Sequence, residues 1–182
     1  MPFLKRISIL LAALLLGAQV HASDGLQLQE QQIKAGLLYN FLKYTNFPAA
    51  SFTNANIITV CIFGDDPFSG NLQPIAGRTV NQREIALRTI HDISAAGNCQ
   101  LLFVNEEEKS RWPQLRAALA GKNVLTVSDF ENFATQGGMI EFGHADNHIH
   151  VNLNIDALTS AGLRVEDRLL RLVTVVHGGS HE

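Results

Sequence analysis

Apolar runs alternate with helical patterns along this chain, and that alternation predicts an α/β fold. Residues 57–63 read IITVCIF, an unbroken apolar run rich in β-branched side chains, which is typical of a strand covered on both faces. Further strands are predicted at 84–90, 99–104 and 123–127. Helical patterns separate several of these runs, so we expect parallel pairing through crossover connections.

Two later runs predict a hairpin. Residues 139–142 and 148–153 flank the turn-forming tetrapeptide His144-Ala145-Asp146-Asn147. We therefore predict a three-layer sandwich, with a mostly parallel, flavodoxin-like sheet and an antiparallel edge hairpin. That strand order places the first and third strands side by side.

Helices are expected at five places. They cover 33–48, 105–120, a short segment opened by Ser128-Asp129-Phe130-Glu131, 155–161 and 165–176. Gly64-Asp65-Asp66 follows the first strand, at the edge where an open α/β sheet binds ligands. The simpler interpretation is that Asp65 or Asp66 caps a helix that starts at Pro67.

The helix IKAGLLYNFLKYTNFP (33–48) has more apolar residues than one buried stripe requires. At 100° per residue, half of its circumference is expected to pack on the sheet; this half comprises Ile33, Leu37, Leu38, Phe41, Leu42 and Tyr44. The remaining strip contains Gly36, Tyr39, Asn40, Lys43 and Phe47. It is either a surface for a partner or ligand, or an exposed strip with Phe47 bent into the core. Glycine in mid-helix costs up to about 1 kcal/mol relative to alanine, which close approach by another element could offset.

Arginines recur in the last predicted helix. Arg164, Arg168 and Arg171 follow one another at intervals of three or four residues and could bind a carboxylate or phosphate. The alternative is a solvated face with ion pairs to Glu166 and Asp167.

The first 22 residues have the pattern of a secretory signal peptide. Lys5 and Arg6 precede the apolar run 7–18, and Val20-His21-Ala22 offers small residues for cleavage after Ala22. The apolar run is too short to span a bilayer, which needs about 20 residues. We therefore expect residues 23–182 to form a single exported domain with no membrane insertion after cleavage.

Charge and cysteine content narrow the possible partners. The formal charge is −3, and no basic patch is evident, so nucleic acid is not an expected partner. Cys61 and Cys99 are the two cysteines of the chain. In an oxidising compartment such a pair is expected to form a structural disulfide, since a redox-active pair usually has C-x-x-C spacing.

The sequence offers no catalytic set. It lacks G-x-S-x-G, Walker and G-x-G-x-x-G motifs, so we predict neither an enzyme nor a cofactor. His148 and His150 share one face of a strand, with His144 nearby. Because no further residues complete a ligand set, we expect a solvent-facing strand and no metal site.

Several stretches together resemble the YfiR family of periplasmic regulators. They are KAGLLYNFLKYTNFP (34–48), TVCIFGDDPF (59–68), GNCQLLFV (97–104), LTVSDFENFATQGGMIEF (125–142) and VNLNIDALTSAGLRVEDRLLRL (151–172). The resemblance covers nearly all of the chain after the signal peptide. Cys61 and Cys99 match one disulfide of the family pattern, and the second cysteine pair of some members is missing.

The resemblance implies a non-enzymatic periplasmic repressor that binds the sensor portion of an inner-membrane diguanylate cyclase. It also implies an outer-membrane lipoprotein as a second partner, and a possible homodimer. The alternative function is a periplasmic module that senses a small ligand in its α/β crevice and acts with another membrane sensor. We take Gly36, Tyr39, Asn40, Lys43, Arg168 and Arg171 as the candidate partner- or ligand-binding residues.

Overall fold

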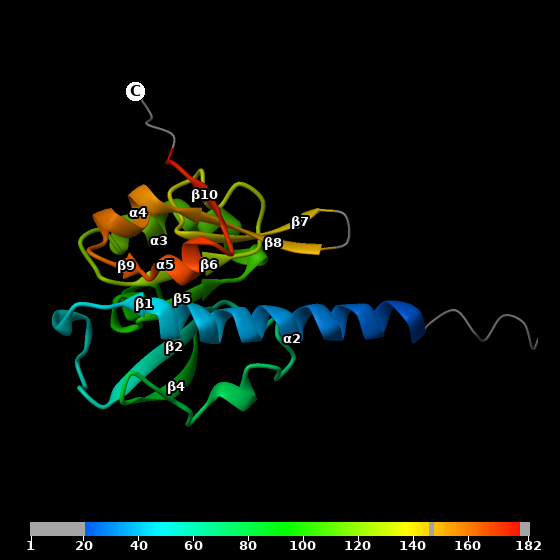
Figure 1. Ribbon diagram of the computed structural model, residues 1–182, viewed down its shortest axis with the longest axis horizontal. Coiled ribbons are helices and arrows are strands. Elements are labelled where there is room, and N and C mark those ends of the chain that lie inside the picture. The colour runs from blue at the N-terminus through cyan, green and yellow to red at the C-terminus, as the bar shows by residue number, and fades with distance from the viewer. Residues whose placement is uncertain (1–20, 146–147, 179–182) are drawn as a thin grey trace, which may run out of the picture.

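A computed structural model describes residues 21–145 and 148–178 (Figure 1). The helices are α2 (His21–Tyr44), α3 (Trp112–Ala118), α4 (Ile155–Ser160) and α5 (Asp167–Leu170), with 3-10 turns η1 (Ala49–Ser51), η2 (Gln73–Ile75), η3 (Ile93–Asn98) and η4 (Glu106–Arg111). The strands are β1 (Thr45–Asn46), β2 (Ile57–Phe63), β3 (Thr79–Val80), β4 (Arg83–Ile90), β5 (Leu101–Val104), β6 (Leu125–Ser128), β7 (Ile140–Ala145), β8 (His148–Asn154), β9 (Arg164–Val165) and β10 (Thr174–Val176).

The main sheet has the order β10-β8-β7-β6-β5-β2-β4-β3. β4, β2, β5, β6 and β7 run parallel to one another, which gives the flavodoxin-like order that the sequence predicts. β2 and β5, the first and third predicted strands, are paired, and β7 and β8 form the predicted antiparallel hairpin. β10 then pairs parallel to β8 and extends the sheet past that hairpin.

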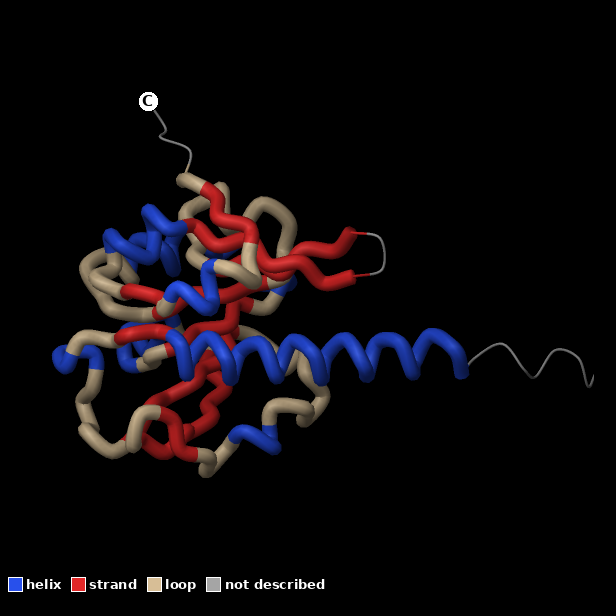
Figure 2. The backbone as a smooth tube through the Cα atoms, viewed as in Figure 1, coloured by secondary structure: helices blue, strands red, loops and turns tan. Residues whose placement is uncertain are grey.

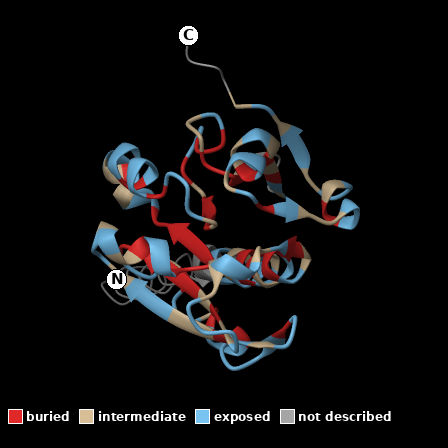
Figure 3. Cartoon of the chain, turned by 90° about the vertical axis from the view of Figure 1, so that its left-hand side faces the viewer, coloured by how far each residue is buried: buried red, intermediate tan, exposed pale blue. Residues whose placement is uncertain are grey.

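Two apolar cores lie on opposite faces of this sheet, because side chains alternate along each strand. In β2, Ile58, Val60 and Ile62 join the core beneath α2, α4 and α5. Cys61 and Phe63 point the other way, into the core beneath α3 and η3. The central strands β2, β5 and β6 are therefore buried between two helical layers, whereas β4 and β10 are more open; Figure 3 shows buried segments in red in the middle of the domain.

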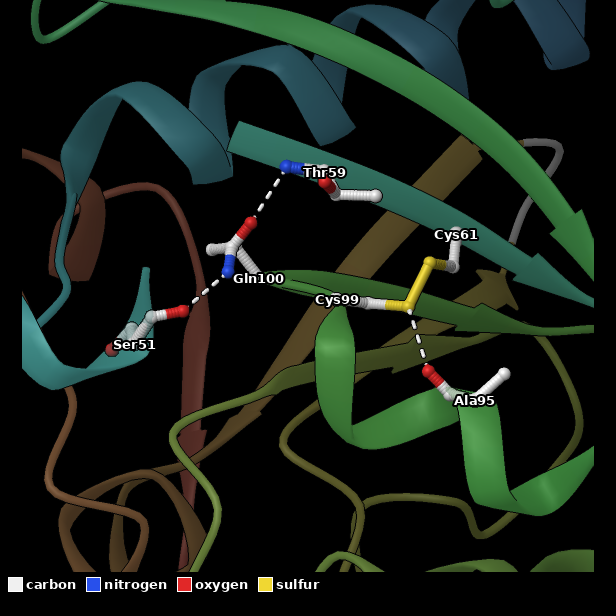
Figure 4. Close-up of a disulfide and its surroundings, with 6 residues drawn as sticks. All are labelled: Ser51, Thr59, Cys61, Ala95, Cys99 and Gln100. Atoms are coloured by element: carbon white, nitrogen blue, oxygen red, sulfur yellow. Dashed lines mark hydrogen bonds between the residues drawn. A yellow bond between two sulfur atoms is a disulfide. The ribbon is translucent and has the colours of Figure 1, made fainter. Parts of the chain in front are cut away.

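The disulfide joins two adjacent strands that the fold prediction brings together. Cys61 in β2 is bonded to Cys99, just before β5, with 5.9 Å between the Cα atoms. Next to it, the Gln100 side chain accepts from Thr59 N at 2.7 Å and donates to Ser51 O (Figure 4). The disulfide and Gln100 together fix η1, β2 and β5 at one end of the sheet.

The last predicted helix, 165–176, is wrong in extent. The helix α5 covers only Asp167–Leu170, and the chain then extends into strand β10. Val173, Thr174, Val175 and Val176 are β-branched and favour a strand, and the free edge of β8 supplies the backbone partners.

Two shorter helices predicted from capping residues are also wrong. Residues 131–137 form turns, and the backbone N–H of Ala134 donates to Glu141 Oε2 at 2.8 Å. After β2, Asp66 Oδ1 accepts from Phe68 N at 2.8 Å but caps a turn. A side-chain cap satisfies a single N–H equally well in a turn, so it does not by itself specify a helix.

The helix predicted at 105–120 forms as a 3-10 segment, η4, that continues into α3. Asn105 caps it, and the Asn105 side chain accepts from Glu107 N at 3.0 Å. The predicted signal peptide, residues 1–22, lies almost wholly outside the described residues. Within the described ranges, no helix has both the length and the hydropathy to cross a bilayer.

Candidate functional site

Helix α2 has a buried side and an exposed side, and its four candidate partner-binding residues lie on or next to the exposed side. Leu38, Phe41 and Leu42 are at most 1% exposed and pack on the sheet, as predicted. Ile33 was expected among them but is 48% exposed. Lys34 is buried instead, because ion pairs with Glu30 and Asp129 offset the cost of burying its charge.

The predicted strip of α2 is largely open to solvent. Gly36, Asn40 and Lys43 are exposed, and Tyr39 is half-buried. Phe47 follows the turn and packs against the core next to Phe52. Among the described residues, nothing lies within 4 Å of a Cβ built on Gly36, so no element of this domain approaches it closely.

Cationic side chains cover Tyr39, which belongs to this strip, and Tyr44, which follows Lys43 in the chain. The Arg78 guanidinium lies 4.5 Å from the ring centroid of Tyr39. Lys43 Nζ and the Arg168 guanidinium lie 5.2 and 4.9 Å from the ring centroid of Tyr44. We call the surface formed by Arg78, Tyr39, Lys43, Tyr44 and Arg168 the cationic face.

Arg168 lies next to α2 because the segments that follow α2 and precede α5 are hydrogen-bonded to each other. Thr45 and Asn46 of β1 pair antiparallel with Val165 and Arg164 of β9. Glu166 N donates to Tyr44 O at 2.9 Å, which holds α5 against the end of α2. The structure thereby joins two predicted site segments that are more than 120 residues apart in the sequence.

The two arginines of the last predicted helix differ in their surroundings. Arg168 Nε forms an ion pair with Glu166 Oε2 at 2.8 Å while its guanidinium lies over Tyr44. Arg171 is exposed at the end of α5 and does not belong to the cationic face as defined. The predicted run of arginines therefore does not form one face.

A second feature is a cleft of about 760 Å³ at the carboxyl ends of β2, β5 and β6, the edge that the sequence indicates for a ligand; the contribution of α2 to this cleft was missed by sequence reasoning. Asp65 and Asp66 lie in it, where the ligand edge of such a sheet is expected. Its acidic residues come from α2 and from three loops: Glu30, Asp65, Asp66, Glu106, Glu107, Asp129 and Glu131. We call it the acidic cleft.

Lys34 is the buried cation of the acidic cleft. It is 2% exposed, and its Nζ lies 2.7 Å from Glu30 Oε1 and 2.8 Å from Asp129 Oδ2. Burial by itself would lower the pKa of Lys34, but the hydrogen bonds and charges of Asp129 and Glu30 raise it above its ordinary value. The spacing of Glu30 and Lys34, four residues apart on a helix, was the available sequence signal.

Glu30 also contacts the hairpin. Its Oε1 lies 2.8 Å from His144 Nε2, and this contact joins α2 to β7. In the backbone view of Figure 2, the first turns of α2 and the hairpin strands extend from the domain on the same side. Burial opposes ionisation of Glu30, yet the hydrogen bonds from Lys34 and His144 outweigh it and lower the pKa of the carboxyl. This contact with Glu30 gives the His144 side chain a structural role.

His148 and His150 are exposed on β8, as predicted, and the His150 ring packs over Gly143. Among residues 21–145 and 148–178, no three His, Cys, Asp or Glu side chains are grouped closely enough to hold a metal ion. The many carboxylates of the acidic cleft are spread along its walls.

The fold defines an α/β domain with a mostly parallel sheet and one disulfide. The model of the YfiR/HmsC-like family matches residues 31–174, so this chain belongs to that family. A solved structure described as the ABC domain in complex with L-Trp from Streptococcus pneumonia matches with a TM-score of 0.47 and 6% identity. The match covers 69% of this chain and 57% of the solved chain, so it spans less than two thirds of the length of that solved chain.

Proposed function

We propose that this protein is a periplasmic negative regulator that binds the sensor portion of an inner-membrane diguanylate cyclase and represses synthesis of cyclic di-GMP. Membership of the YfiR/HmsC-like family over residues 31–174 is the observation that carries this proposal. The predicted signal peptide supports export. Repression acts by protein contact and requires no chemistry from the regulator.

The cationic face is the surface that we assign to this contact. It combines two half-buried tyrosine rings with three cationic side chains, of which Arg168 is also ion-paired with Glu166. Tyrosine and arginine are the residue types most enriched at the centres of protein interfaces. Exposed Gly36 and Asn40 beside them leave room for a partner element to approach the α2 backbone.

The direct test is deletion of the gene in its own host, followed by measurement of cyclic di-GMP. We expect the level to rise and to return to normal when the intact gene is restored. An unchanged level in a strain whose cyclase is intact would contradict the proposal. We also expect an outer-membrane lipoprotein to sequester the regulator, which co-purification checks. A homodimer is a further expectation, which light scattering checks.

The acidic cleft favours one alternative function, a module that senses a small ligand and acts with another membrane sensor. Its volume is within the range of about 300–1,000 Å³ that is usual for ligand sites. A thermal-shift screen distinguishes the two functions. A ligand that stabilises the protein but leaves cyclase capture unchanged would favour the alternative.

A further inference from the structure

A separate groove lies at the other edge of the sheet, where the amino ends of the strands meet the ends of two helices. It encloses about 330 Å³ between α3 and α4, with the start of β6 and the turn before β7 as its floor. α3 covers one face of the sheet and α4 covers the other, so the groove crosses the sheet edge between the two cores. We call it the α3–α4 groove.

The walls of the groove are apolar. Trp112, Leu119, Val124 and Met139 form its deep part and are 2–9% exposed. Alanines and glycines surround them, and their small side chains keep the space open: Ala117, Ala120, Ala157, Ala161, Gly121 and Gly137.

The polar groups of the deep wall already have partners. Trp112 Nε1 donates to Gln136 O at 3.2 Å, and Thr126 Oγ1 accepts from Met139 N at 3.1 Å. A ligand body that enters the groove therefore meets apolar atoms, and burial of its own apolar surface supplies the affinity.

The charges on the groove are all of one sign. Arg116 and Lys122 are the charged residues that line it, and both are exposed at its rim. Arg116 uses Nη1 to donate to Gln136 O at 2.9 Å, which holds the guanidinium over Gly137 and leaves its other N–H groups for a ligand. α3 and α4 end at the groove, but a helix terminus contributes at most about half a negative charge, which two full positive charges outweigh.

The α3–α4 groove is also firmly framed. Asn123 Nδ2 donates to Ala161 O at 2.7 Å and ties the end of α4 to the start of β6. Trp112 is fixed on its other side by Phe133, with 4.5 Å between the ring centroids. The groove therefore exists without a ligand, so binding requires little reorganisation.

We propose that the α3–α4 groove binds a small amphipathic carboxylate, with its apolar body between α3 and α4 and its carboxylate between Arg116 and Lys122. The volume is at the lower end of the range of about 300–1,000 Å³ that is usual for ligand sites, so it suits a small molecule. Octanoate has this size and chemistry and is the probe that we choose. The proposal concerns a different edge of the sheet from the acidic cleft and does not depend on the cyclase.

Trp112 makes the test direct, because it is the single tryptophan of the chain and lies in the groove wall. The full exported chain is titrated with octanoate, 1-octanol and octylamine while Trp112 fluorescence is recorded. We expect a saturable change with octanoate in the micromolar to millimolar range, and binding of octanol and octylamine at least threefold weaker. Octylamine or octanol binding as tightly as octanoate would overturn the assignment of a carboxylate.

Variants then locate the site. Lys122→Gln leaves the fold intact because Lys122 is exposed, and it should weaken octanoate binding about three- to tenfold while octanol binding stays unchanged. Ala157→Leu fills the groove and should abolish binding of both. The matched control Lys109→Gln, another exposed lysine, should bind octanoate as the unaltered protein does. Absence of a saturable change at millimolar octanoate, or equal octanoate binding by Lys122→Gln and the unaltered protein, would overturn the proposal.

Discussion

Lys34 Nζ lies 2.8 Å from Asp129 Oδ2 and thereby ties helix α2 to the end of β6, across 95 residues of sequence. The same nitrogen contacts Glu30 one helical turn earlier, and Glu30 contacts His144 in the hairpin. One buried cation thus fixes the position of α2 relative to the sheet. Since α2 also presents the cationic face, this ion-pair network sets the orientation of the proposed partner surface.

Replacing Lys34 tests that network. Lys34→Met keeps most of the buried volume but leaves two carboxylates without their cation, and we expect a loss of about 1–3 kcal/mol in the free energy of unfolding. The loss stays below that of a fully buried pair because Glu30 and Asp129 remain partly open to water. Urea unfolding measures it. Lys43→Met, an exposed change in the same helix, should cost less than about 1 kcal/mol.

The lowered pKa of Glu30 predicts a pH dependence at the acidic end. A carboxyl whose pKa is lower in the folded state than the ordinary 4.5 adds stability above that value, and this stability is lost as the pH falls through the folded pKa. Glu30→Gln should therefore lose stability relative to the unaltered protein at pH 6–7 but much less at about pH 3. A difference that stayed constant over this range would show that the contacts of Glu30 do not depend on its charge.

The raised pKa of Lys34 predicts the opposite behaviour at alkaline pH. Its contribution is fully present below the ordinary pKa of 10.5 and is lost as the pH rises through the folded value. Unfolding midpoints should fall above pH 10.5 in the unaltered protein. Lys34→Met should lack this Lys34-dependent part of the decline.

The disulfide is expected to contribute strongly to stability. It closes a loop with a sequence separation of 38, and the chain-entropy estimate for such a loop is about 3–4 kcal/mol. Cys61→Ala combined with Cys99→Ala should lower the free energy of unfolding by about that amount, as should reduction of the unaltered protein. If reductant left the unfolding midpoint unchanged, the two thiols would not be bonded in the isolated protein.

Two glycines should respond oppositely to alanine. A Cβ on Gly138 would lie 2.3 Å from the buried ring of Phe133, so Gly138→Ala should cost about 1–3 kcal/mol. Gly36 has open space around it in mid-helix, so Gly36→Ala should gain about 0.5–1 kcal/mol. Thermal unfolding of the two variants checks the signs.

The cationic face predicts how charge reversal acts on cyclase binding. Lys43→Glu and Arg168→Glu should each weaken capture of the cyclase's periplasmic portion and raise cyclic di-GMP, with little effect on unfolding. Arg88→Glu is the matched control, since Arg88 is exposed on β4 and lies toward the opposite face of the sheet. Full repression by a folded Lys43→Glu, Arg168→Glu double variant would show that the partner binds elsewhere.

Sequence pattern alone was sufficient for the parallel centre of the sheet and the β7–β8 hairpin, but not for β3 and β10 at the two edges. The apolar run IITVCIF and its successors predict strands buried on both faces, and the crossover pattern predicts their parallel order. That order places Cys61 and Cys99 on neighbouring strands, in agreement with the disulfide predicted from export and from the presence of two cysteines. These features follow from local side-chain chemistry, whose periodicity of two or 3.6 residues is written in the chain.

Tertiary structure decided the burial of Lys34 and the length of the last helix. It also decided the shapes of the acidic cleft and the α3–α4 groove. Lys34 can be buried only because Asp129 lies beside it, and no local pattern encodes that distance. Val173 to Val176 favour a strand by their β-branched side chains, but they can form one only where the free edge of β8 supplies hydrogen bonds. Arg168 meets Tyr44 only after β1 and β9 pair. Each of these outcomes depends on a group that is distant in the sequence. The sequence therefore determines which side chains can form ion pairs and hydrogen bonds, and the tertiary structure decides which of them come into contact.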